Sequence, residues 1–304
     1  MSLGYDRPLY ILAFDHRTSF QTKLFGIDGI PTSADRERMA EAKRIILRGL
    51  LSVAETTEPG VLGALSDEEH GASAARDAKA SGLQLAMSAE RSSQPEFELE
   101  YGDRFGEHID AFEPDFVKVL VRYNPGGDAE MNRRQAARLA ELSRWLAPRA
   151  TKFLFELIVP PEPAQLALLE SEPEAFADEL RPQLVATAIG ELQAAGVEPD
   201  VWKVEGMTSA DDYRLVADAA TAGGRDQVGC VVLGAGADES TVAHWLQEAA
   251  GVNGFIGFAI GRTIFWDALS RWIDGAIDGD AAAALIADNY RRTIDLYTSA
   301  TQAV

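Results

Sequence analysis

Cysteine is almost absent from this 304-residue sequence: Cys230 is the single one, so no disulfide can form within the chain. A lone cysteine is typical of proteins in a reducing compartment, and we expect a cytoplasmic protein. No apolar run approaches the ~20 residues that a membrane-spanning helix needs. The first residues also lack the charged-then-apolar pattern of a signal peptide. We therefore expect no membrane partner.

Basic residues are few: 28 Lys and Arg stand against 48 Asp and Glu, which gives a formal net charge of −20. A chain so acidic repels nucleic acids and anionic membrane surfaces, and we exclude both as main partners. Basic residues that gather at one place on such a chain indicate a bound anion there.

Histidine is scarce as well, with four in the chain. A zinc site needs several ligands at suitable spacing, and the histidines show no such pattern. The acids Asp15, Asp67, Glu68 and Glu90 follow predicted strands and leave a Mg²⁺ site open as an alternative. We predict no metal and no other cofactor.

Eight short apolar segments alternate with segments whose apolar residues recur at helical spacing. Strands of this kind suit a parallel sheet covered on both faces. The sequence therefore predicts an α/β fold, a single (β/α)8 TIM barrel over residues 1–304. A doubly wound sheet is the alternative, but it usually has a glycine-rich dinucleotide loop after strand one, where this chain has Asp15-His16-Arg17. The predicted strands are 7–14, 60–65, 83–87, 115–121, 152–159, 200–204, 227–233 and 254–259, and the predicted helices include 71–81, 97–112 and 164–195, the last interrupted near Pro173 and Pro182.

One lysine lies in the middle of a predicted strand. Strand side chains alternate between faces, so Val201, Lys203 and Glu205 share one face. Burial favours the neutral form of a lysine, and a neutral amine attacks carbonyl carbons. Lys203 is therefore a candidate Schiff-base residue for a sugar-type ketone, and a salt-bridged or snorkelling lysine is the structural alternative.

The same alternation places further charged side chains inside the predicted barrel, near the C-terminal strand ends where barrel enzymes hold their active sites. Lys118 and Arg122 share the inward face of one strand, and Glu156 lies on the inward face of the next. We expect Lys118, Glu156 and Lys203 to converge on one site, with a structural ion pair in the barrel as the alternative. Strand ends add Glu90, Arg122 and Glu205 as candidate substrate contacts.

Glycines follow the last two predicted strands, at Gly234, Gly236 and Gly261, and Arg262 comes next. Barrels often bind phosphate here, because glycines expose backbone N–H groups. We also expect the helix that begins near Asp238 to point its N-terminus at the anion. The alternative is a pair of tight turns without a ligand.

Five segments resemble the aldolase domain of the myo-inositol catabolism proteins, the 2-deoxy-5-keto-gluconate 6-phosphate aldolase type, which in turn is similar to the class I tagatose-bisphosphate aldolases. They are residues 9–20, 116–124, 153–156, 202–206 and 257–263, and the likeness runs over nearly the whole chain. The resemblance implies a TIM barrel that cleaves a phosphorylated keto sugar acid to dihydroxyacetone phosphate and malonate semialdehyde.

The resemblance also implies roles for single residues. Lys203 takes the place of the Schiff-base lysine, Glu156 of the proton shuttle and Lys118 of an assisting cation. Asp15 and Arg17 take the place of substrate contacts. The implied partner is a phosphorylated small molecule, and the sequence leaves open whether the chain forms homo-oligomers.

Three positions depart from the pattern of that family: Ala235 between the two glycines, Arg91 after the third strand, and His70. They motivate a second hypothesis, a phosphosugar-binding barrel without catalysis. A metal-dependent aldolase is the third.

Overall fold

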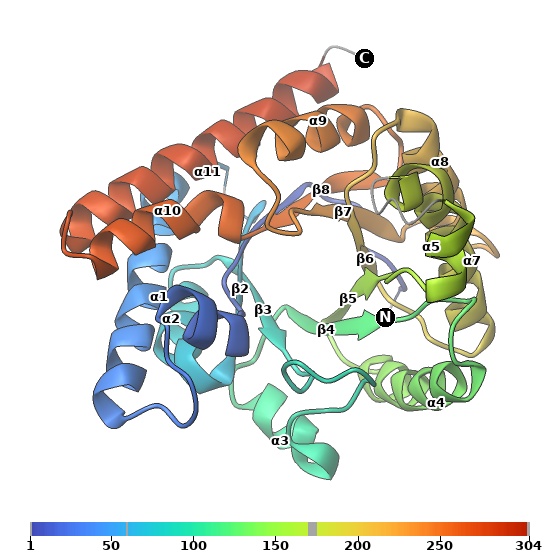
Figure 1. Cartoon of the computed structure of the whole chain (residues 1–304), viewed down its shortest axis with the longest axis horizontal. Coiled ribbons are helices and arrows are strands. Elements are labelled where there is room, and N and C mark those ends of the chain that lie inside the picture. Colours follow the sequence, from blue (N-terminus) through green and yellow to red (C-terminus); the bar gives the residue numbers. More distant parts are fainter. Residues whose placement is uncertain (1, 59, 170–174, 303–304) are drawn as a thin grey trace.

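The computed structural model describes residues 2–58, 60–169 and 175–302, and it is a closed barrel of parallel strands surrounded by helices (Figure 1). Each strand pairs with the next in chain order, and the last pairs with the first. The predicted (β/α)8 TIM barrel is confirmed. The strands are β1 (Leu9–Ala13), β2 (Leu62–Ser66), β3 (Gln84–Ser88), β4 (Phe116–Arg122), β5 (Lys152–Ile158), β6 (Val201–Glu205), β7 (Gly229–Leu233) and β8 (Phe255–Ile260).

Helices follow the strands and cover the outside of the barrel (Figure 1). Several begin at a side chain that accepts a hydrogen bond from the first turn, as Ser209 does for the helix after β6. None of the described helices is both long and apolar enough to cross a membrane. The helices are α1 (Ser33–Ala54), α2 (Glu68–Ala80), α3 (Phe105–Asp110), α4 (Ala129–Leu146), α5 (Pro163–Leu168), α7 (Arg181–Ala194), α8 (Ala210–Thr221), α9 (Glu239–Ala250), α10 (Arg262–Ile273) and α11 (Gly279–Gln302), with short helical turns at Phe20–Leu24, Gly102–Arg104 and Phe176–Leu180.

Alternation along the strands separates two apolar layers. On β4, Val117 and Val119 join the large core between the barrel and the helices, whereas Phe116 joins a smaller cluster inside the barrel. Leu154 of β5 and Val201 of β6 belong to that inner cluster. Apolar residues therefore fill the N-terminal half of the barrel, and the inward positions that follow them carry charge.

The predicted helix 97–112 is wrong in its first part. Residues 105–110 are helical, but the chain between β3 and α3 forms a loop in which Glu90 pairs with Leu99 as an isolated antiparallel bridge. The backbone N–H of Phe97 donates to the side chain of Gln135, 2.8 Å away. These long-range contacts outweigh the helical spacing of the apolar residues.

Another boundary differs from the prediction. The helix predicted from residue 71 begins at Glu68, because Asp67 caps it by accepting the N–H of His70 at 2.8 Å. The region predicted to be helical over 164–195 changes near Pro182 as expected: the π-helical turn Phe176–Leu180 ends there and α7 begins at Arg181, with Pro182 in its first turn, where the missing N–H removes no helical hydrogen bond. The interruption predicted near Pro173 lies outside the described residues.

Candidate active site

A cavity of about 400 Å³ opens at the C-terminal ends of the strands. Its position agrees with the rule that barrel enzymes place their sites at this end. All of the site residues predicted from the sequence line it: Asp15, Arg17, Glu90, Lys118, Arg122, Glu156, Lys203, Glu205, Gly234, Gly236, Gly261 and Arg262.

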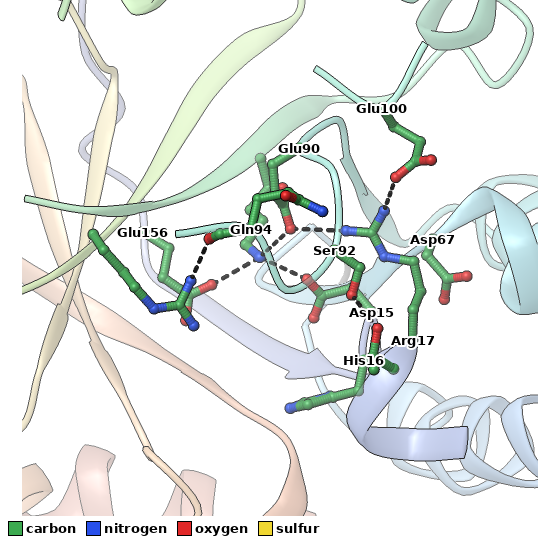
Figure 2. Close-up of polar contacts among 12 residues, drawn as sticks. Asp15, His16, Arg17, Asp67, Glu90, Ser92, Gln94, Glu100 and Glu156 are labelled. Carbon is green, nitrogen blue, oxygen red and sulfur yellow. Dashed lines mark hydrogen bonds and ion pairs between the residues drawn. The ribbon is translucent and has the colours of Figure 1, made fainter. Parts of the chain in front are cut away.

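Lys118 lies among three carboxylates, those of Asp15, Glu90 and Glu156, which are labelled in Figure 2. Its Nζ is 2.7 Å from Oδ2 of Asp15, 3.1 Å from Oε1 of Glu90 and 2.9 Å from Oε2 of Glu156. Only 1% of Lys118 is exposed. Burial lowers the pKa of Lys118, but the three carboxylates outweigh it and hold this pKa well above its usual value. Lys118 is therefore a permanent cation.

Lys203 and Glu156 face each other across adjacent strands. They are paired in the register of β5 and β6, and Nζ of Lys203 lies 3.0 Å from Oε2 of Glu156. The same oxygen also contacts Lys118. Burial raises the pKa of Glu156, but Lys118 and Lys203 outweigh it, so this pKa lies below its usual value. Glu156 is an ionised proton acceptor within hydrogen-bond distance of the Lys203 amine.

The other two carboxylates around Lys118 differ in their pKa. Burial raises the pKa of Asp15, but Lys118 and Lys203 outweigh it and hold it well below its usual value. Burial raises the pKa of Glu90, and Lys118 and Arg17 only partly offset this effect. Both contacts to Glu90 go to Oε1, while Oε2 is buried without a partner among the described residues. The site therefore holds carboxyl groups of different acidity, as acid–base catalysis requires.

Three predicted substrate contacts already bind other parts of the chain. Arg17 is buried and donates to Glu90 at 3.0 Å and to Glu100 at 3.3 Å. Glu205 lies 3.4 Å from Arg181 and accepts the Val159 N–H at 3.0 Å.

Arg122 is exposed, and its Nη1 donates to the backbone oxygen of Gln94 at 3.2 Å. Of the two arginines, Arg122 has the guanidinium that is more accessible to a ligand.

The glycines after β7 and β8 form one wall of the cavity with Arg262. The Arg262 guanidinium donates to the backbone oxygen of Ala235 at 2.6 Å. Gly236 has a φ of +78°, and a Cβ there would lie 2.6 Å from Cζ of Arg262. A side chain at this position would be strained and would displace the arginine.

The helix N-terminus at this wall is not the predicted one. At α9 the carboxylate of Asp238 accepts the N–H of Thr241 at 2.9 Å, and this residue does not line the cavity. The hydrogen bonds from Ser240 and Thr241 lower the pKa of Asp238 to about 2. The N-terminus at the cavity belongs to α10, where Gly261 is the N-cap and supplies no side chain.

The four acids proposed for a metal do not meet at one point: Asp15 and Glu90 converge on Lys118, and the other two bind elsewhere. Asp67 is fully buried and bound to Lys43, and Glu68 lies 2.9 Å from Nδ1 of His108. The described part of the chain holds no group of three or more His, Cys, Asp or Glu side chains arranged as a metal site.

Sequence reasoning missed Glu100, Gln94 and Lys43, all of which contact site residues. Glu100 and Gln94 lie in the loop after β3, and Lys43 reaches the backbone oxygen of His16 from α1. No local pattern in the sequence marks these residues, because their partners are distant along the chain.

Comparisons with known proteins bear on family and fold. A family described as "Uncharacterized protein conserved in bacteria (DUF2090)" matches residues 5–301. No curated protein matches the chain.

Solved structures share the fold. A fructose-bisphosphate aldolase from Plasmodium falciparum, solved with TRAP and a small-molecule inhibitor, has a TM-score of 0.64 at 15% identity, over 98% of this chain and 97% of that one. A Schiff base-forming fructose-1,6-bisphosphate aldolase has a TM-score of 0.52 at 17% identity, over 92% and 93%. Cgl0159 from Corynebacterium glutamicum has a TM-score of 0.56 at 18% identity, over 96% and 88%.

Proposed function

We propose that this chain, which belongs to the DUF2090 family, is a class I aldolase that cleaves a phosphorylated keto sugar or keto sugar acid through a Schiff base. The observation that carries the proposal is the buried Lys203 amine, 3.0 Å from an ionised Glu156, inside a cavity with an arginine and glycine wall. The likeness in fold to a Schiff base-forming fructose-1,6-bisphosphate aldolase supports it.

The first steps need only these two side chains. Glu156 takes a proton from the Lys203 ammonium, and the free amine attacks the substrate ketone to form a carbinolamine. The protonated Glu156 then donates to the carbinolamine hydroxyl, which leaves as water and produces the iminium. Glu156 ends as a carboxylate, so its proton is accounted for.

Cleavage follows from the iminium. Glu156 accepts the proton of the substrate hydroxyl, the carbon–carbon bond breaks, an aldehyde leaves and the electron pair passes into an enamine. Glu156 then protonates the enamine, and hydrolysis releases the ketone. The permanent charge of Lys118 stabilises negative charge that develops on oxygen next to it. For a keto sugar acid of the inositol pathway, the products are dihydroxyacetone phosphate and malonate semialdehyde.

Binding of the substrate is assigned to the two ends of the cavity. Arg262 and the backbone N–H groups at the start of α10 hold the phosphate. Arg122 holds a second anionic group, such as a carboxylate, at the other end. Arg17 keeps Glu90 in place through the contact described above. A phosphorylated keto acid or a bisphosphate therefore fits the site better than a neutral sugar.

Borohydride trapping tests the proposal. Incubation with dihydroxyacetone phosphate and borohydride should give a covalent adduct by mass spectrometry on the wild type and on Lys23→Met, an exposed lysine on the turn after β1. Lys203→Met should give no adduct and no cleavage. Phosphate binding without any adduct would favour the non-catalytic barrel. Activity that resists borohydride and is lost with a chelator would favour the metal-dependent aldolase.

A further inference from the structure

His16 is the member of the Asp15-His16-Arg17 segment that the mechanism above leaves unused. It lines the cavity at the end of β1 and is half-buried. Its ring meets Phe265 of α10 edge to face, with centroids 5.9 Å apart. Figure 2 shows that its side chain points away from the guanidinium of Arg17. The ring therefore lies between the first strand and the start of α10.

Two features outside the ring hold it there. The backbone oxygen of His16 accepts a hydrogen bond of 3.0 Å from Nζ of Lys43, which is fully buried and paired with Asp67. Gly261 leaves room on the other side, because a Cβ there would lie 3.2 Å from Cε1 of the ring. The position of His16 is thus set by α1 and by the β8–α10 connection together.

The ring itself has an unused hydrogen-bonding atom. Nδ1 is buried and has no hydrogen-bond partner among the described residues. Burial, together with the charges of Arg262 and Lys203 and against the opposing charge of Asp15, lowers the pKa of His16 to about 4. The imidazole is therefore neutral near pH 7, with one donor and one acceptor. Buried polar atoms without a partner are rare, so the ring has hydrogen-bonding capacity that the described residues do not use.

We propose that His16 is a substrate-binding residue that recognises the hydroxyl group on the carbon beside the ketone. A hydroxyl can donate to or accept from one nitrogen of a neutral imidazole, whereas the phosphate is matched by the cation of Arg262. The inference rests on the proposed function, because it needs the ketone at Lys203. The predicted substrate class is a hydroxyketone phosphate.

Dihydroxyacetone phosphate and hydroxyacetone phosphate differ only in this hydroxyl, so borohydride trapping with each ketone tests the inference. The wild type should reach half-maximal adduct at a concentration of dihydroxyacetone phosphate roughly tenfold lower, the size expected for one hydrogen bond. His16→Leu should lose the preference. His16→Gln, whose amide keeps a donor and an acceptor, should retain most of it. The exposed His244→Leu is the matched control.

The outcomes separate the two proposals. A wild type that forms no adduct with either ketone would overturn the proposed function and this inference with it. A wild type that traps both ketones equally would overturn the inference alone, even if His16→Leu failed to fold. So would a His16→Leu variant that keeps the preference but binds inorganic phosphate more weakly, because the ring would then serve the phosphate.

Discussion

Replacement of Lys118 by Met removes the cation on which three buried carboxylates converge. Two of these keep a second cation: Glu90 is 3.0 Å from Arg17, and Glu156 is 3.0 Å from Lys203. Asp15 keeps no other ion pair among the described residues. The variant therefore leaves Asp15 buried without an ion-pair partner, with Lys203 as the remaining lysine that acts on its pKa. Removal of one partner from such a pair lowers the free energy of unfolding by ~3–5 kcal/mol, which we expect for Lys118→Met at pH 7.

The loss should depend on pH in a defined direction. The pKa values of Asp15 and Glu156 lie below their usual values in the folded chain, so their stabilisation is present above the unfolded carboxyl pKa of about 4 and is lost as pH falls through the folded pKa. In Lys118→Met, burial is the largest remaining influence on the pKa of Asp15 and raises it, so we expect the variant to bind a proton on folding. The difference between the two proteins should therefore shrink as the pH falls from 7 towards 4.

Urea unfolding monitored by far-ultraviolet circular dichroism at pH 7, 5.5 and 4.5 measures the free energy of unfolding for both proteins. Lys79→Met is the matched control, because its partner Asp115 is 30% exposed and the pair is worth little. The double variant Lys118→Met with Asp15→Asn should recover much of the lost stability, because it removes the uncompensated charge. A loss at Lys118 no larger than at Lys79, or one that grows as the pH falls, would refute the reasoning.

Two further predictions concern the chemistry and the anion wall. Glu156→Gln should lower the turnover number for a cleaved ketose phosphate by ~10²–10⁴, since it keeps the shape of the side chain and removes the proton acceptor. Isothermal titration should show that the variant binds inorganic phosphate as the wild type does. Full turnover would assign the proton transfers to another group. Gly236→Ala should raise KM for the same substrate with little change in the turnover number, because the new Cβ would lie 2.6 Å from Cζ of Arg262 and displace that side chain. An unchanged KM would show that Arg262 does not bind the phosphate.

Alternation along the strands was sufficient to predict which side chains enter the barrel. Lys118, Glu156 and Lys203 line one cavity as expected, because successive residues of any strand point to opposite faces. The eight strands were predicted from a different feature: each is a short apolar segment followed by charged or glycine residues. Local sequence also contains the Ser209 cap, whose partner is three residues away.

Pairings between distant residues were decided by the tertiary structure. Residues 97–101 of the loop after β3 were predicted to be helical, and Arg17 was expected to contact substrate. In the fold, Glu100 from that loop reaches Arg17 across 83 positions of the chain. The helix N-terminus at the cavity is that of α10 because Asp238 caps α9 with its own side chain.

The amino-acid order alone thus determined the barrel, its polar end and the face on which each charged group lies, because those properties depend on neighbours within a few residues. Closure of the sheet decided the rest. It brought residues at the ends of β1 and β3 and on β5 around the ammonium group of Lys118 on β4. The pKa of each carboxyl depends on these distances between side chains, which no local pattern encodes.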